Sequence, residues 1–317
     1  RDRDVTGVQT CALPIFVVDV AKGVETQTRR LMEVCRMRNT PVMVFVNKLD
    51  REGKDPFEIL DELEEELQIN VRPLSWPIDM GDRFRGVYNL YSSSLDLYKP
   101  SKQVVTESVQ LDIESPDLEK HISPDLSKTL RSEVELITEV YPEFNREDYL
   151  AGKLAPVFFG SALNNFGVKE LLDCFVEIAP SPRKIESEER VVEPLEEAFT
   201  GFVFKIHANM DPNHRSRIAF VKVCSGKFER NVNYKHVRFN RMMKFSSPTA
   251  FMAQKKEILD EAYAGDIVGL PDTGNFMIGD TLTSGENLHF KGLPSFSPEM
   301  FKYIENADPL KSKQLQI

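Results

Sequence analysis

Residues 41–50 read PVMVFVNKLD, in which an apolar run is followed at once by a polar tetrad. The apolar run is rich in β-branched residues and predicts a strand buried on both faces, as in a parallel sheet covered by helices. In open sheets of this kind, ligands bind at the carboxyl ends of the strands. The pattern therefore places the side chains of Asn47, Lys48 and Asp50 where a loop can contact a small molecule.

The tetrad Asn47-Lys48-Leu49-Asp50 resembles Asn-Lys-x-Asp, the guanine-reading motif of GTPases. A carboxylate such as that of Asp50 can accept two parallel hydrogen bonds from N1–H and the exocyclic amine of guanine, a pair of donors that adenine lacks. The stem of Lys48 can lie against the purine while its ammonium stays in water, and the Asn47 amide can tie neighbouring loops together. Leu49 is then a packing residue. The resemblance implies GTP or GDP as the ligand.

Residues 156–163, PVFFGSAL, contain a second short apolar run that ends in a tight turn. The triplet Ser161-Ala162-Leu163 resembles the last guanine-contacting motif of GTPases, in which a backbone N–H meets the base O6. Both motifs follow predicted buried strands, in the order found in GTPases. We therefore expect one guanine site formed by Asn47, Lys48, Asp50, Ser161, Ala162 and Leu163.

Residues 1–15 are excluded from the fold prediction. Residues 5–15, VTGVQTCALPI, match codon by codon the translation of a common short-read sequencing adapter. No continuous apolar segment follows a basic start, as it would in a targeting peptide. In biological terms, the chain is therefore expected to begin near Phe16.

Composition is typical of a globular protein, with 28% charged and 41% hydrophobic residues, and a length of 317 residues suggests two domains. No apolar run approaches the ~20 residues that a membrane span needs, so no membrane association is expected. The net charge of −10 argues against a purely electrostatic nucleic-acid binder. Cys35, Cys174 and Cys224 lack metal-ligand spacing and predict buried, reduced thiols. We expect a cytoplasmic monomer.

The segment 16–180 alternates strands and helices, which predicts a parallel sheet. A strand at Phe16–Val20, a helix at Glu25–Arg38 and the tetrad strand are followed by a helix that opens at Asp55-Pro56, an N-cap and first-turn pair. The acidic run 62–66 within this helix is interpreted as its solvated face. A closing helix over 168–178 carries an apolar stripe made of Val168, Leu171, Leu172 and Phe175.

More chain lies between the two motifs than one helix and one strand need, so we predict an inserted subdomain at about residues 72–150. Residues 81–98 are typical of a hairpin, and Ser123-Pro124 opens a helix. Trp76 is expected to anchor the core of the insertion. Residues 179–198 contain three prolines and many glutamates, and predict an extended linker over residues 181–198. Short strands at 199–206, 218–223, 234–239 and 266–270 predict a β-barrel domain over 199–292, and 293–317 the start of a truncated third domain.

Together these features resemble translational GTPases of the elongation factor G type and, among them, the bacterial peptide chain release factor 3 family. The likeness covers residue 16 to the end and is densest in FFGSAL at 158–163, SWPI at 75–78, FTGFVFKI at 199–206 and ANMDP at 208–212. It implies a GTP-binding factor that engages the ribosome and helps to eject class I peptide chain release factors, with GTP hydrolysis. His214, Arg215 and Arg217 could face a phosphate backbone.

The sequence departs on every count from the pattern that GTP hydrolysis requires in this family. It contains no Gly-x-x-x-x-Gly-Lys-[Ser/Thr] phosphate loop and no Asp-x-x-Gly-His before Phe16. No catalytic or metal residue is assigned, and Mg²⁺ is expected only in the full-length protein. The predicted fold is a partial P-loop GTPase domain of the α/β class with an inserted subdomain, followed by an all-β translation-factor barrel. Such a fragment should bind guanine nucleotide weakly or not at all, and strand Phe16–Val20 should have an unpaired edge.

Two other interpretations remain. The chain could come from an elongation factor G-like translocation GTPase, which carries more domains after the barrel. It could also be a non-enzymatic ribosome-binding module that uses the barrel to hold ribosomal RNA or a protein. The second interpretation predicts that Asp50→Asn leaves activity unchanged. A guanine-binding site should instead lose affinity for GDP and gain affinity for xanthine nucleotides.

Overall fold

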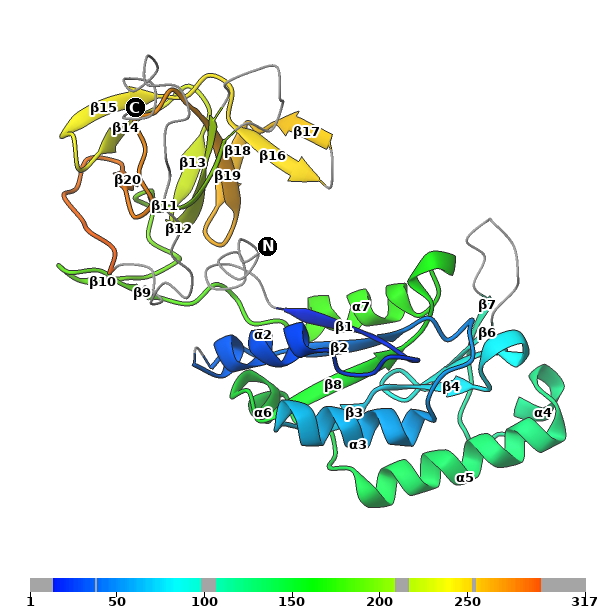
Figure 1. The fold of residues 1–317 in the computed structure, drawn as a ribbon. Helices are drawn as coiled ribbons and strands as arrows, with labels where there is room; N and C mark the ends of the chain where they lie inside the picture. Colours follow the sequence, from blue (N-terminus) through cyan, green and yellow to red (C-terminus); the bar gives the residue numbers. More distant parts are fainter. Residues whose placement is uncertain (1–13, 38, 98–106, 209–216, 253–254, 292–317) are drawn as a thin grey trace, which may run out of the picture.

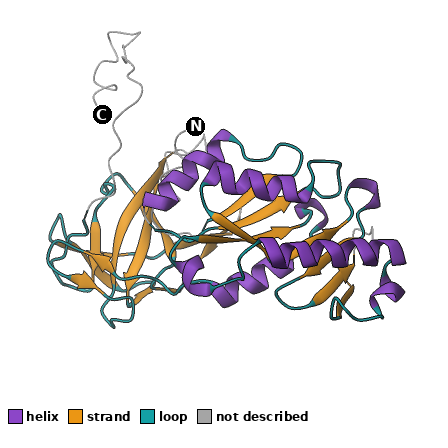
Figure 2. Cartoon of the chain, turned by 90° about the horizontal axis from the view of Figure 1, so that it is seen from below, coloured by secondary structure: helices purple, strands orange, loops and turns teal. Residues whose placement is uncertain are grey.

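The computed structural model describes residues 14–37, 39–97, 107–208, 217–252 and 255–291, which form an α/β lobe and an all-β lobe (Figure 1). All helices of the described residues belong to the first lobe (Figure 2). The adapter assignment for residues 1–13, the basic residues His214 and Arg215, and the predicted third domain at 293–317 lie outside the described residues. Of the helices described, none is long and apolar enough to cross a membrane.

The α/β lobe is built on a four-stranded parallel sheet in the order β1 (Ile15–Asp19), β2 (Met43–Asn47), β8 (Leu154–Phe159), β3 (Asn70–Pro73). The parallel sheet predicted from the sequence is confirmed. Within the described residues β1 lies at an edge, as expected, and it begins at Ile15, inside the segment that was set aside.

The tetrad strand β2 is buried on both faces, as predicted. Val44 and Val46 pack on one side with α2 (Thr26–Met37) and α3 (Pro56–Leu67). Met43 and Phe45 pack on the other side with α6 (Arg146–Leu150) and α7 (Val168–Ile178). Each of these side chains contributes about 1.5–3 kcal/mol by burial, which fixes the strand between two helical layers.

Helix α3 begins as the sequence predicts. Asp55 is its N-cap and accepts the Phe57 N–H at 2.9 Å, and Pro56 is the first helical residue. The prediction that residues 62–66 form only a solvated face was wrong. Glu62 accepts the Val24 N–H at 2.9 Å, and Glu64 accepts the Val71 N–H at 2.8 Å. These carboxylates supply acceptors to backbone N–H groups of neighbouring segments, a role that helical periodicity cannot reveal.

The inserted segment forms an antiparallel sheet in the order β4 (Ser75–Ile78), β5 (Gly86–Asn89), β6 (Ser94–Leu97), β7 (Glu107–Gln110). The 3₁₀ turn η1 (Gly81–Arg83) and helices α4 (Leu118–His121) and α5 (Pro124–Val140) complete it. Trp76 is buried, and its Nε1–H donates to Glu133 of α5 at 2.8 Å. Its ring also lies 4.6 Å from that of Phe57 and 5.4 Å from that of Phe159, so it joins the insertion to the main core.

The stripe predicted for α7 was wrong at one position. Leu172 is 47% exposed, whereas Leu171, Cys174 and Ile178 are buried. The true stripe follows the i, i+3, i+7 spacing of one helix face, and Leu172 lies just outside it.

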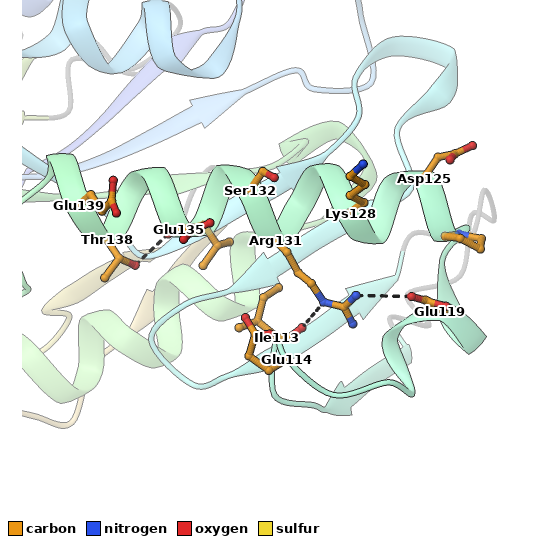
Figure 3. A pocket seen from close by; sticks show the side chains of 12 residues that line it. Ile113, Glu114, Glu119, Asp125, Lys128, Arg131, Ser132, Glu135, Thr138 and Glu139 are labelled. Carbon is orange, nitrogen blue, oxygen red and sulfur yellow. Dashed lines mark hydrogen bonds and ion pairs between the residues drawn. The ribbon is translucent and has the colours of Figure 1, made fainter.

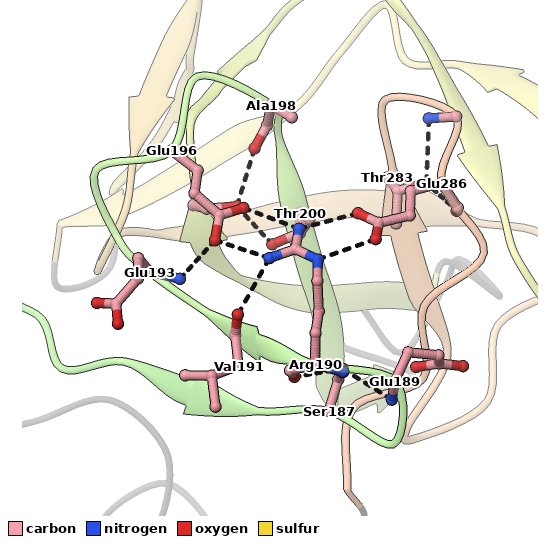
Figure 4. Close-up of polar contacts among 12 residues, drawn as sticks. Ser187, Glu189, Arg190, Val191, Glu193, Glu196, Ala198, Thr200, Thr283 and Glu286 are labelled. Atoms are coloured by element: carbon pink, nitrogen blue, oxygen red, sulfur yellow. Dashed lines mark hydrogen bonds and ion pairs between the residues drawn. The ribbon is translucent and has the colours of Figure 1, made fainter.

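Residues 181–198, expected as an extended linker, contain the hairpin of β9 (Ile185–Glu186) and β10 (Val191–Val192). Val192 is buried with Phe202 and Phe290 of the β lobe. Arg190 forms ion pairs with Glu196 at 2.7 Å and Glu286 at 2.9 Å (Figure 4). The segment is therefore attached to the β lobe, through contacts that its composition does not show.

The β lobe contains an eight-stranded sheet with an apolar core that includes Phe199, Phe228 and Tyr234. Within the described strands no pairing joins β15 to β17, so the sheet is an open half-barrel, which is compatible with the predicted barrel. A separate pair is formed by β13 (Lys227–Glu229) and β18 (Glu261–Tyr263). In order, the large sheet consists of β15 (Arg241–Lys244), β14 (Asn233–His236), β20 (Thr281–Thr283), β11 (Thr200–Ala208), β12 (Arg217–Ser225), β19 (Ile267–Asp272), β16 (Thr249–Met252) and β17 (Lys255–Ile258).

Candidate functional site

The two sequence motifs meet at the carboxyl ends of β2 and β8. Asp50 Oδ1 accepts the Ser161 hydroxyl at 2.6 Å, and Asn47 Oδ1 accepts the Ala162 N–H at 2.8 Å. The strands before them are parallel neighbours, with Val46 opposite Phe159. We call the adjoining carboxyl ends of β1, β2 and β8, with Asp19, residues 47–50 and residues 160–163, the motif edge.

A glycine is required where the second motif leaves β8. A Cβ on Gly160 would lie 2.3 Å from the Phe166 carbonyl oxygen and 2.8 Å from the ring of Phe45. The Gly160 N–H donates to Val46 O at 2.9 Å, and its carbonyl accepts the Leu49 N–H at 3.2 Å. Leu49 is fully buried, as expected of a packing residue. Gly160 thus allows the two loops to approach closely enough for Asn47 and Asp50 to bond across.

The loop after Gly160 is closed on itself. Ser161 and Phe166 exchange both backbone hydrogen bonds, at 3.0 and 2.9 Å, around the 3₁₀ turn η2 (Ala162–Asn164). Asn164 also donates to the Ser161 hydroxyl at 2.9 Å. Ser161 is buried, while Leu163 is 83% exposed. Asn47, Lys48 and Asp50 are half-buried, and Ala162 is exposed although its N–H joins the two loops.

Lys48 has a left-handed backbone, with φ of +74°. For a residue with a Cβ this conformation costs about 1–2 kcal/mol and persists only where the surroundings impose it. Its N–H donates to Asn47 Oδ1 at 2.8 Å, and its ammonium lies 2.6 Å from Asp19 Oδ2. We expected the ammonium to remain in water; instead it is paired, with 44% of the lysine side chain exposed.

Sequence reasoning missed Asp19, although a signal for it was present. It ends β1 opposite Asn47, so the rule that parallel strands present their carboxyl ends at one edge also applies to it. The hydrogen bond from Lys48 lowers the pKa of Asp19 below its usual value, with help from the Ala21 N–H, while burial opposes the shift. The carboxylate is therefore ionised and paired at neutral pH.

No group of three potential metal ligands converges on one point within the described part of the motif edge. Asp19 and Asp50 are already engaged by Lys48 and Ser161, respectively. Among the described residues, one group of three potential metal ligands occurs, Glu188, Glu189 and His289, and it lies on the surface of the β lobe. We therefore derive no metal-dependent step from these residues.

A groove of about 930 Å³ runs along α5 on the inserted subdomain (Figure 3). Arg131 spans it, donating to Ile113 O at 3.0 Å and pairing with Glu119. None of the expected site residues lines it. Its acidic lining residues are Glu114, Glu119, Asp125, Glu135 and Glu139. The groove gives no support to a nucleotide site.

Comparison with known proteins agrees with this geometry. Residues 3–181 match the elongation factor Tu GTP binding domain, and residues 198–285 match elongation factor G domain 2. The crystal structure of a protein from Thermus thermophilus superimposes with a TM-score of 0.66 at 22% sequence identity, over 92% of this chain and 44% of that one. This chain thus spans less than half the length of that protein.

The first match extends over more than half of the chain and includes both motifs of the motif edge. The second match covers the half-barrel that follows. The chain belongs to the translation-factor GTPase family, with a GTP-binding domain of the elongation factor Tu type followed by a domain of the elongation factor G domain 2 type.

Proposed function

We propose that the motif edge binds the guanine base of GTP or GDP. Asp50 accepts the base N1–H and exocyclic amine, Asn47 holds the two loops together, and the stem of Lys48 lies against the purine. Ser161, Ala162 and Leu163 form the opposite loop on the O6 side of the base, where the N–H groups of Ser161 and Ala162 are already donated to Phe166 O and Asn47 Oδ1. The observation that carries this proposal is the pair of hydrogen bonds between the motifs, Ser161 to Asp50 and Ala162 to Asn47.

The Ser161 hydroxyl gives Asp50 a fixed orientation. It occupies Oδ1, and no side chain or backbone group of the described residues donates to Oδ2. A carboxylate held in this way is preorganised for a planar donor pair. A base without those donors leaves the carboxylate desolvated and unpaired, and sites built in this way discriminate by as much as about 10⁴-fold.

The binding test compares GDP, ADP and xanthosine diphosphate by ligand-observed NMR. Because the sequence carries no phosphate-loop motif, the affinity for GDP should be weaker than micromolar, but GDP should be preferred over ADP. Asp50→Asn should reverse the preference toward xanthosine diphosphate, because the amide donates where the carboxylate accepts. Asp125→Asn, on the exposed start of α5, is the matched control. Equal binding of GDP and ADP by the unaltered chain would refute the proposal.

We further propose that the whole protein is a cytoplasmic GTPase of translation termination, of the release factor 3 kind, that acts on the ribosome and on class I release factors. The sequence likeness at residues 158–163 and 199–206 supports this assignment. The β14–β15 hairpin adds support for a ribosomal RNA contact. Residues 233–244 contain four basic and no acidic side chains, in a chain of net charge −10.

Two ribosome measurements test this second proposal. Charge reversal at Arg241 and Lys244, which are exposed, should weaken cosedimentation of the chain with ribosomes, and Asp125→Asn should not. The chain should also bind post-termination ribosomes that carry a class I release factor more tightly than ribosomes awaiting translocation. The reverse preference would favour a translocation factor.

A further inference from the structure

We infer that Asp19 is a positioning residue for the proposed guanine site: its carboxylate fixes Lys48, so that the lysine stem is held at the motif edge before the base arrives. The inference rests on the proposed function and concerns a residue that belongs to neither motif. Asp19 Oδ2 lies 2.6 Å from the Lys48 ammonium. The Asp19 side chain is 16% exposed and that of Lys48 is 44% exposed, so the pair is only partly shielded from water.

The backbone of Lys48 is consistent with this role. Its φ of +74° turns the residue away from the direction of β2. The conformation is held by the bond from Lys48 N–H to Asn47 Oδ1 and by the Arg51 N–H, which donates to Lys48 O at 3.0 Å. A strained residue held from several sides at a candidate site indicates that its side-chain direction matters. The ammonium–Asp19 contact is the only one of these restraints that acts on the far end of the side chain among the described residues.

Asp19 is itself held in place. Its Oδ1 accepts the Ala21 N–H at 2.9 Å, which leaves Oδ2 for Lys48. Its carbonyl accepts the Gly23 N–H at 2.8 Å in a tight turn, in which Gly23 has φ of +72°. The next residue, Val20, donates to Asn47 O at 3.0 Å and so continues the β1–β2 pairing. The carboxylate therefore has one orientation relative to the tetrad.

A second pair supports the turn from α3. Glu62 accepts the Val24 N–H at 2.9 Å and the Lys54 ammonium at 2.7 Å. Lys54 in turn donates its backbone N–H to Val20 O at 3.1 Å. A Cβ on Gly23 would lie 2.3 Å from the Glu62 carboxylate, so glycine permits this close contact. The segment that carries Asp19 is thus held from both the tetrad side and the helix side.

A lysine that is ordered in the free protein loses less conformational entropy on binding than a mobile one. Ordering a long side chain accounts for about a 2- to 12-fold change in affinity. The stem contacts a purine face without regard to its hydrogen-bonding groups, so this contribution should be the same for every purine. Asp19 is expected to set affinity, and Asp50 to set base identity.

The test uses Asp19→Asn, Lys48→Met and the double variant. Lys48→Met keeps the aliphatic stem and removes the charge. The first readout needs no nucleotide: a ¹³C carboxyl NMR titration of Asp19 in the unaltered chain and in Lys48→Met. The pKa of Asp19 should lie below its usual value in the unaltered chain and rise in Lys48→Met. No rise would show that the pair does not form in solution and would overturn the inference.

The second readout is GDP affinity. Each single variant should bind GDP about 2- to 12-fold more weakly than the unaltered chain. The double variant should lose no more affinity than Lys48→Met alone, because Asp19 acts through Lys48. In an Asp50→Asn background, Asp19→Asn should weaken the binding of xanthosine diphosphate by the same factor. A gain of GDP affinity in Asp19→Asn would show that the nucleotide has to break the Asp19–Lys48 pair in order to bind. Additive losses in the double variant would show that the two residues act independently. Either result overturns the inference.

Failure of the two proposals can be told apart. If the unaltered chain shows no preference for GDP over ADP, the guanine proposal fails and the positioning role fails with it, whatever the titration shows. If GDP is preferred and Asp19→Asn leaves its affinity unchanged, only the positioning role fails. Asp82→Asn, an exposed aspartate of η1, is the matched control and should change neither readout.

Discussion

Gly160→Ala should disrupt the motif edge without disturbing the β lobe. The new methyl group would lie 2.3 Å from Phe166 O and 2.8 Å from the ring of Phe45, and both distances are shorter than real Cβ contacts. The Phe166 carbonyl cannot move away cheaply, because it accepts the Ser161 N–H at 3.0 Å. We expect a loss of about 3 kcal/mol in the free energy of unfolding, at the upper end of the effects of overpacking.

The chain provides its own probe for this experiment. Trp76 is the sole tryptophan, and its ring packs 5.4 Å from that of Phe159, the neighbour of Gly160. Its fluorescence in a urea titration therefore reports unfolding of the α/β lobe. With a denaturant slope of about 2 kcal/mol per M, the midpoint should fall by about 1.5 M. Preference for GDP over ADP should also be lost, because Ser161 and Ala162 move with the turn.

The control is Gly152→Ala, at a glycine with φ of +70° and only the Thr40 carbonyl oxygen, at 4.0 Å, near the new methyl group. This variant should cost about 1–2 kcal/mol through backbone strain alone and leave GDP preference unchanged. A Gly160→Ala midpoint no lower than that of Gly152→Ala would refute the close approach described here.

Two further predictions concern ion pairs. Burial opposes ionisation of Glu62, but its hydrogen bonds from Lys54 and from the Val24 N–H outweigh this effect and lower its pKa. The stability that the pair contributes is therefore fully present above the usual glutamate pKa of about 4.5. It is lost as the pH falls through the lower pKa of the folded state. Lys54→Met should cost about 1 kcal/mol at pH 7, and the difference from the unaltered chain should shrink in urea titrations as the pH is lowered below the usual glutamate pKa. A difference that stays constant would contradict this assignment. Arg190→Met removes the partner of Glu196 and Glu286 and should expose the linker hairpin, seen as faster tryptic cleavage after Lys184. Lys291→Met, which removes a single exposed pair with Glu186, should leave that rate nearly unchanged.

The parts of the fold that follow from local patterns could be predicted from the sequence. The apolar run before Asn47 predicted a strand buried on both faces, and Asp55-Pro56 and Ser123-Pro124 predicted helix starts that the structure confirms. The meeting of the two motifs could also be foreseen, since both follow parallel strands.

Features that depend on tertiary partners could not be predicted. Whether Glu62 faces water or a backbone N–H depends on how the turn after β1 packs against α3. The positive φ of Lys48 and the pairing of its ammonium with Asp19 both depend on neighbouring segments, and no lysine propensity suggests them. Arg190 attaches the linker hairpin to Glu196, within the linker, and to Glu286, which follows β20, and such ion pairs leave no periodic signal.

The strand order of the parallel sheet has a consequence for how the lobe is made. β8 comes late in the chain but lies between β2 and β3, so both strands lack their shared neighbour until β8 has been synthesised. The bond from Ala162 to Asn47 closes a sequence separation of 115 residues. Contacts this distant form slowly, because the entropy of closing the loop is lost before they can form. During synthesis, β2 therefore has an unpaired, exposed edge until β8 and the second motif have left the ribosome.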